Sequence, residues 1–136
     1  MDTVSALVRS KIMSRVRSED TKPEILVRRL VHSMGFRYRL HVKDLPGRPD
    51  LVFPAKRKVI FVHGCFWHGH NCEAGTLPQS NVDYWSVKQA RNMARDRQSL
   101  RSLARDGWKT LVIWECKLRV VDRVSRRVRK FLNGTR

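Results

Sequence analysis

Residues 50–63 read DLVFPAKRKVIFVH, which is two apolar runs joined by Pro-Ala-Lys-Arg. Short apolar runs on either side of a few turn-forming residues are typical of a β-hairpin. A turn at the middle of this segment pairs residues whose numbers sum to about 111–113. That register sets Asp50 opposite Val62 or His63. We therefore expect the hairpin to bring a carboxylate and an imidazole together at one end.

Helical and extended patterns lie on both sides of the hairpin. The predicted elements are a basic N-terminal helix at 4–17, a helix at 21–34 that Gly35 ends, a strand at 36–42, a long helix at 83–105, an interior strand at 111–116 and a basic C-terminal helix at 120–132. The long helix is expected to bury Val87, Ala90, Met93, Ala94, Leu100 and Leu103. This order predicts one α/β domain over residues 1–136, with helices flanking a mixed sheet.

The chain has 136 residues and 41% of them are hydrophobic, which is enough for one domain with a core. Lys and Arg number 29 against 12 Asp and Glu, so the net charge is +17 and the pI is about 11.2. Such a charge favours a polyanionic partner, nucleic acid first and a membrane surface second. No stretch approaches the roughly 20 apolar residues of a spanning helix, and the N-terminus lacks a signal-peptide core. We therefore expect a cytoplasmic protein without a membrane partner.

The three cysteines point to a metal site. Cys65, His70 and Cys72 offer thiolate and imidazole donors within one irregular segment. Cys116 is the remaining cysteine, and it follows a strand that a sheet could bring near that segment. Four such donors suit a closed tetrahedral zinc site. The alternative is three small buried cysteines among surface histidines, but a role for all three in one site favours zinc.

A second candidate site combines Asp50 with His63 and His68. Nucleases that use Mg²⁺ need a carboxylate on the metal and a group that orients or deprotonates water. A histidine can be that base, because its ordinary pKa lies near neutrality. The alternative for Asp50 is a turn aspartate after a proline. Glu24 lies three residues after Thr21, and this spacing alone indicates a capping box and not a metal ligand.

Aromatic and basic residues near these sites suggest contacts with nucleic acid. Phe66 and Trp67 lie in a polar segment, and Trp85 begins the long helix. Such rings can insert between base pairs or stack on bases, although burial in the core is the more frequent fate of a tryptophan. Two basic helices fit phosphate contacts: the long helix, through Lys88, Arg91 and Arg95, and the C-terminal helix. The alternative for each charge is a solvated face.

Five segments carry a specific pattern: Arg9-Ser-Lys-Ile-Met13, Glu19-Asp-Thr-Lys-Pro-Glu24, Leu45-Pro-Gly-Arg-Pro-Asp50, Val59-Ile-Phe-Val-His-Gly-Cys-Phe-Trp-His68 and Val112-Ile-Trp-Glu-Cys116. Together they resemble the very short patch repair (Vsr) family of mismatch endonucleases. The resemblance implies a restriction-endonuclease-like three-layer fold with one structural zinc. It also implies a Mg²⁺-dependent nick on the 5′ side of the T in a T:G mismatch left by deamination of 5-methylcytosine.

The resemblance further implies roles for individual residues. Asp50 would hold Mg²⁺ together with the backbone carbonyl of Val62. His68 would be the general base, His63 would contact water on the metal, and Glu24 would be a further acid behind the metal ligand. This role for Glu24 adds to the capping role that the spacing indicates.

The remaining implied roles concern zinc and DNA. The zinc ligands would be Cys65, His70, Cys72 and Cys116. The intercalating side chains would be Phe66, Trp67 and Trp85, with Met13 and Val16 of the first helix on the other groove. Asn92 and Asp96 match family positions near the site and the mismatch. The implied partner is double-stranded DNA with a T:G mismatch, bound by a monomer in the bacterial cytoplasm at the nucleoid, with mismatch-repair proteins as further partners.

Three departures from the family pattern limit what is carried over. Val62 stands where the family commonly has Thr, the run after Trp67 is His-Gly-His-Asn and not four histidines, and a short basic tail replaces a longer C-terminal extension. The flanking-sequence preference is therefore not inferred. Two other functions stay open: a Vsr-like restriction or homing nuclease that cuts matched DNA, and a zinc-bearing DNA-binding module without chemistry.

Overall fold

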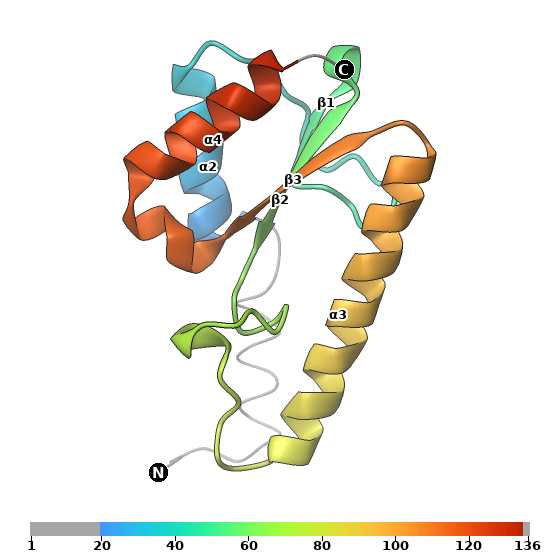
Figure 1. Ribbon diagram of the computed structural model, residues 1–136, viewed down its shortest axis with the longest axis vertical. Helices are drawn as coiled ribbons and strands as arrows, with labels where there is room; N and C mark the ends of the chain where they lie inside the picture. Colours follow the sequence, from blue (N-terminus) through green and yellow to red (C-terminus); the bar gives the residue numbers. More distant parts are fainter. Residues whose placement is uncertain (1–19, 135–136) are drawn as a thin grey trace.

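The computed structural model describes residues 20–134 (Figure 1). The expected N-terminal helix at 4–17, with Met13 and Val16, lies outside the described residues. The described helices and strands are α2 (Lys22–Ser33), β1 (Leu51–Phe53), β2 (Lys58–His63), α3 (Val82–Arg105), β3 (Lys109–Trp114) and α4 (Val121–Asn133). Three short 3₁₀ segments join them, η1 (Pro54–Lys56), η2 (Glu73–Gly75) and η3 (Glu115–Arg119).

The three strands form a mixed sheet in the order β1-β2-β3. β2 pairs antiparallel with β1 and parallel with β3. Leu51 lies opposite Ile60 and Phe53 lies opposite Lys58, so paired residue numbers in the hairpin sum to 111. The predicted hairpin is confirmed, and its register lies at the lower limit of the expected range. Asp50 therefore falls opposite Phe61, one residue before the expected Val62 or His63. β2 is buried at every position, which fits its central place in the sheet.

Two strand predictions need correction. The segment 36–42 is not a strand, because it makes a single bridge from Arg39 to Val52 and the backbone turns at His41, whose φ is 56°. The last strand lies at an edge of the described sheet and not in its interior, and only Ile113 is buried there. Cys116 lies beyond that strand, in η3.

Helices cover both faces of the sheet and give three layers (Figure 1). On one face, α2 and α4 pack against the sheet through Val27, Val31, Val124, Val128 and Leu132. On the other face, the C-terminal end of α3 packs through Leu103 against β1 and β2. The α/β class with a mixed sheet between helices is as predicted. Within residues 20–134, no helix has the length and apolarity needed to cross a bilayer.

The N-terminal half of α3 extends beyond the sheet (Figure 1). For this reason four side chains that were expected to be inward are exposed, namely Val87, Ala90, Met93 and Ala94. The buried residues of α3 are instead Trp85, Gln89 and Leu103. This half of the helix faces the irregular segment 64–80 and not the sheet, and that segment contains the candidate metal ligands.

Candidate active site and metal centre

The first turn of α2 holds Glu24 in a capping box. Oε2 of Glu24 accepts hydrogen bonds from the backbone N–H of Thr21 at 2.6 Å and from its hydroxyl at 2.7 Å. The backbone N–H of Glu24 donates in return to Oγ1 of Thr21 at 3.5 Å. The capping prediction is confirmed. The same carboxylate also lines the cleft described below and accepts a hydrogen bond from Asp50, so capping and a place in the site coexist.

Asp50 lies directly before β1, with its carboxyl turned toward β2. The backbone N–H of Val62 donates to Oδ2 of Asp50 at 2.6 Å, which fixes the carboxyl at the end of the hairpin. Burial and the adjacent Glu24 carboxyl together raise the pKa of Asp50 to about 8, although the hydrogen bond from the Val62 backbone acts to lower it. Burial also acts to raise the pKa of Glu24, but hydrogen bonds from Asp50 and Thr21 outweigh it and leave that pKa below its usual value. Two crowded carboxyls of this kind suit a cation.

His63 and His68 lie face to face beside the two carboxyls. Their ring centroids are 3.8 Å apart and their planes differ by 2°. His63 is 5% exposed, and burial together with the charge of His68 lowers its pKa to about 4. His63 therefore stays neutral at physiological pH. A metal ion lies in the plane of an imidazole that binds it, so two parallel rings cannot share one ion in this arrangement.

Asp96 of α3 orients the ring of His68. Oδ2 of Asp96 lies 2.5 Å from Nδ1 of His68, and both side chains are about a quarter exposed, at 24% and 25%. A proton on Nδ1 leaves Nε2 with a free lone pair, which is the arrangement that a general base requires. The family resemblance predicts that Asp96 lies near the site, and the structure gives His68 as its partner.

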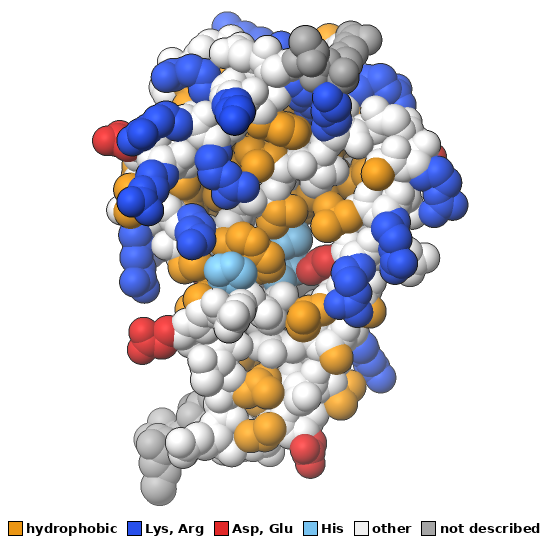
Figure 2. Space-filling model, in the orientation of Figure 1, with side chains coloured by type: hydrophobic (Ala, Val, Ile, Leu, Met, Phe, Trp, Pro, Cys, Tyr) orange, Lys and Arg blue, Asp and Glu red, His pale blue; other side chains and the backbone are white. Residues whose placement is uncertain are grey.

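These groups line one cleft of about 740 Å³. Its walls come from the start of α2, the segment before β1, the end of β2 and the segment after it, the first residue of η3, and α3. Figure 2 shows histidine side chains at the centre of this face, with Lys and Arg side chains above them. The structure thus brings together Glu24, Asp50, Val62, His63, His68 and Asp96 in one cleft, with Phe66 and Trp67 at its wall.

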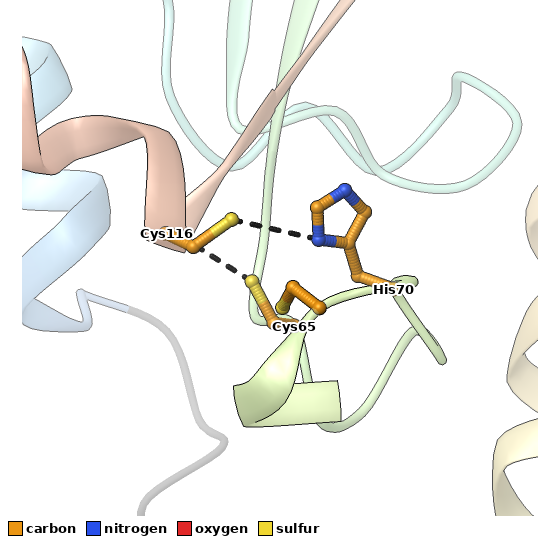
Figure 3. Close-up of side chains that lie close together, drawn as sticks. Cys65, His70 and Cys116 are labelled. Carbon is orange, nitrogen blue, oxygen red and sulfur yellow. Dashed lines mark hydrogen bonds between the residues drawn. The ribbon is translucent and has the colours of Figure 1, made fainter. Parts of the chain in front are cut away.

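The candidate metal centre lies next to this cleft. The ligand atoms of Cys65, His70, Cys72 and Cys116 all lie within 4.8 Å of one another. Sγ of Cys116 is 3.5 Å from Nδ1 of His70, and the backbone N–H of Cys116 donates to Sγ of Cys65 at 3.4 Å (Figure 3). Parallel pairing explains the meeting of distant cysteines: His63 pairs with Trp114, and Cys65 and Cys116 each follow two residues later.

The donor set fits zinc. Bonds of about 2.3 Å to sulfur and about 2.1 Å to nitrogen in a tetrahedral site place S and N about 3.6 Å apart. The Cys116–His70 distance of 3.5 Å agrees with this value. Burial and the neighbouring thiols raise the pKa of Cys65 to about 12, whereas a hydrogen bond from His70 lowers that of Cys72 to about 7. A bound cation stabilises the thiolate form of cysteines that are crowded in this way.

Two polar residues of α3 hold the backbone of this segment. Nε2 of Gln89 donates to the carbonyl oxygen of Phe66 at 2.6 Å and to that of Gly75 at 3.2 Å. Nδ2 of Asn92 donates to the carbonyl oxygen of Trp67 at 2.8 Å. Sequence reasoning missed Gln89. A signal existed, since Gln89 lies one helical turn after Trp85 and therefore shares its inward face.

Phe66, Trp67 and Trp85 form an aromatic cluster with edge-to-face contacts. Phe66 lies 5.3 Å from Trp67 and 5.5 Å from Trp85, centroid to centroid. Phe66 and Trp67 are partly exposed, but Trp85 is 0% exposed. Trp85 therefore supports the other two rings in this arrangement and presents no face to a partner, contrary to the expectation that it intercalates. The basic residues of α3 lie nearby, with Nζ of Lys88 5.8 Å from the Trp67 ring and with Arg91 and Arg95 exposed.

Comparison with known proteins supplies independent findings. Residues 1–74 match the family model of the DNA mismatch endonuclease Vsr. The chain is 51% identical over 132 residues to the Type II nicking enzyme V.XorIIP of Xanthomonas oryzae pv. oryzae, and the match covers 97% of each chain. It is 41% identical over 133 residues to the Type II nicking enzyme V.NmeAIP of Neisseria meningitidis serogroup A, covering 95% of each. It is 39% identical over 124 residues to the DNA mismatch endonuclease Vsr of Escherichia coli, covering 91% of this chain and 80% of that protein.

Proposed function

Because the chain belongs to the Vsr family of DNA mismatch endonucleases, we propose that it makes a Mg²⁺-dependent nick 5′ of the T in a T:G mismatch. Such mismatches arise when 5-methylcytosine is deaminated. The observation that carries the proposal is one cleft that combines the Asp50 and Glu24 carboxyls, the stacked His63 and His68 rings, and the partly exposed Phe66 and Trp67. We further propose that the three layers correspond to a restriction-endonuclease-like fold.

The residues of the cleft have different roles in the proposed hydrolysis. Asp50 and the backbone carbonyl of Val62 would hold Mg²⁺, which supplies positive charge beside the scissile phosphate. Glu24 shares a hydrogen bond with Asp50 and so sets the position of that carboxyl. His68 accepts the proton of the attacking water on Nε2, while Asp96 holds Nδ1. His63 stays neutral and keeps the His68 ring in place by stacking.

Zinc has a structural role in this proposal. Cys65, His70, Cys72 and Cys116 would hold it, and it would join the segment after β2 to the segment after β3. Phe66 and Trp67 follow the first ligand directly, so the same junction supports these two rings. Supported rings can enter the base stack next to a mismatch, where unstacking costs only a few kcal/mol.

The DNA contacts are proposed on both sides of the aromatic pair. Lys88, Arg91 and Arg95 of α3 would contact phosphates. Asn92 bonds to the Trp67 carbonyl and would place that ring toward the mismatch. Met13 and Val16 would approach from the opposite groove.

Two duplexes that differ only in a T:G or T:A pair test the function in the presence of Mg²⁺. The T strand of the T:G duplex should be nicked and the T:A duplex should stay intact. Nicking of the matched duplex would favour a restriction-type nuclease. Binding of both duplexes without Mg²⁺-dependent nicking would favour a DNA-binding module.

A matched pair of variants tests the placement of the metal. Asp50→Asn should abolish nicking and keep DNA binding, because it removes a metal ligand and adds no negative charge to the surface that faces phosphate. Asp44→Asn removes an exposed carboxylate from the segment before β1 and should nick like the parent. Substantial nicking by Asp50→Asn would show that the metal is bound elsewhere.

A further inference from the structure

The surface of η3 and α4 is strongly basic. Between Lys117 and Gly134 the chain has seven Lys and Arg residues and one acidic residue, Asp122. All seven side chains are exposed, and none forms an ion pair with another residue in the range 20–134. They are Lys117, Arg119, Arg123, Arg126, Arg127, Arg129 and Lys130. We name them the α4 basic surface.

Helical geometry arranges much of this charge as a stripe. α4 buries Val124, Val128 and Leu132 against the sheet. Arg123, Arg126, Arg127 and Lys130 follow the i, i+3, i+4, i+7 spacing, and this places them together on the opposite side of the helix. At 1.5 Å per residue the stripe is about 10 Å long.

Packing does not require this charge. The buried valines and leucine anchor the helix, and like charges three or four residues apart on a helix repel each other. Unpaired cations in such a row lower stability, while a polyanion laid along them removes the repulsion. The surface therefore favours an anionic partner over simple solvation.

The α4 basic surface is continuous with the cleft. η3 begins at Glu115, which lines the cleft, and α4 follows η3 directly and runs away from the cleft along the sheet (Figure 1). Figure 2 shows Lys and Arg side chains extending over this part of the molecule from the histidines outward. If a duplex binds in the cleft, some of its phosphates lie close to η3, where the α4 basic surface begins.

We propose that the α4 basic surface binds phosphates of the same DNA duplex beyond the cleaved step, as a second contact region apart from the aromatic pair and α3. Phosphates of one strand follow each other every 3.4 Å or so along the axis, so a stripe of about 10 Å spans about three of them. The proposal rests on the proposed function for the seating of DNA in the cleft.

Two triple variants of equal charge provide the test. Arg123→Ala/Arg126→Ala/Arg127→Ala removes three of the four charges of the stripe. Arg97→Ala/Arg101→Ala/Arg105→Ala removes three exposed charges from the C-terminal half of α3, on the other face of the sheet. Alanine favours helix at all six positions, so both should fold. Binding is measured against salt concentration on duplexes of about one and about three helical turns.

On the longer duplex the slope of log affinity against log salt should fall by about 0.9 for each lost phosphate contact, or about 2–3 in the α4 triple variant. The slope on the longer duplex should fall less in the α3 triple variant. On the short duplex, the α4 triple variant should have nearly the same affinity as the parent. Equal slopes in the two triple variants, or a slope unchanged from the parent, would overturn the proposal. Single-turnover nicking at saturating protein should be the same in all three proteins, and its absence from the parent would contradict the proposed function alone.

Discussion

Gln89 of α3 is hydrogen bonded to the carbonyl oxygen of Phe66, with Nε2 at 2.6 Å from that oxygen. The same nitrogen lies 3.2 Å from the carbonyl oxygen of Gly75. One amide group therefore ties two points of the segment 64–80, which contains three of the candidate metal ligands, to one helix. Phe66 directly follows Cys65, so this bond links the candidate metal ligands to the rings proposed to meet the mismatch.

Gln89→Met should lower the free energy of unfolding by about 1–3 kcal/mol, because it keeps the side-chain volume and leaves two carbonyl groups without a donor. Zinc should stay bound, while affinity for a T:G duplex should fall. Urea unfolding, metal content and duplex titration measure these effects. Gln98→Met alters an exposed position of the same helix and serves as the control. Parent-like stability of Gln89→Met would contradict the bridging role.

Freshly purified protein should contain one zinc per chain. His70→Ala should lose the metal and much of the stability, because structural zinc contributes on the order of 10 kcal/mol of folding free energy. Cys116→Ala should behave in the same way. Elemental analysis and thermal melting measure both effects, with His32→Ala on the exposed face of α2 as the control. Absence of zinc from the parent protein would contradict the assignment of these residues as zinc ligands.

His68→Ala should slow single-turnover nicking by roughly 10²–10⁴-fold if the ring is the general base. Asp96→Asn should cause a smaller loss, because it removes the group that orients the ring. The double variant should be no slower than His68→Ala, since the two residues act as one unit. Asp106→Asn, at the far end of α3, is the control. Additive losses would mean that Asp96 acts independently of His68.

Trp67→Ala should fold with its zinc and bind T:G duplexes more weakly, by about 1–3 kcal/mol for one lost ring–base contact. It should also discriminate less between T:G and T:A, because a mismatch is easier to unstack. Trp67→Phe keeps an aromatic ring and should recover part of both properties. Competition binding with the two duplexes measures the ratio. An unchanged ratio in Trp67→Ala would leave mismatch sensing to other residues.

The stability of the protein without added Mg²⁺ should fall as pH rises. The pKa of Asp50 is raised from 3.8 to about 8 by burial and by Glu24. Folded Asp50 therefore keeps a proton that the unfolded chain releases, and the free energy of unfolding declines between about pH 4 and about pH 8. Asp50→Asn should show a weaker decline in urea unfolding across this range. Identical pH dependence in the two proteins would remove Asp50 as the cause.

Local sequence determined the features that depend on near neighbours. The two apolar runs around Pro-Ala-Lys-Arg set the hairpin register, because a shift by one residue would turn the buried side chains outward. Thr21 and Glu24 specified the start of α2 through two reciprocal hydrogen bonds. The spacing of Cys65, His70 and Cys72 within one short segment predicted a metal site from the sequence alone.

Only the tertiary structure decided what depends on the packing of distant segments. The parallel register of β2 and β3 brings Cys116 to Cys65, and no local pattern encodes that pairing. The extension of α3 beyond the sheet exposes Val87 and buries Trp85 and Gln89, because the helix there faces the segment 64–80 and not the core. Helical periodicity gives the faces of a helix, but which face is covered depends on what the rest of the chain brings against it.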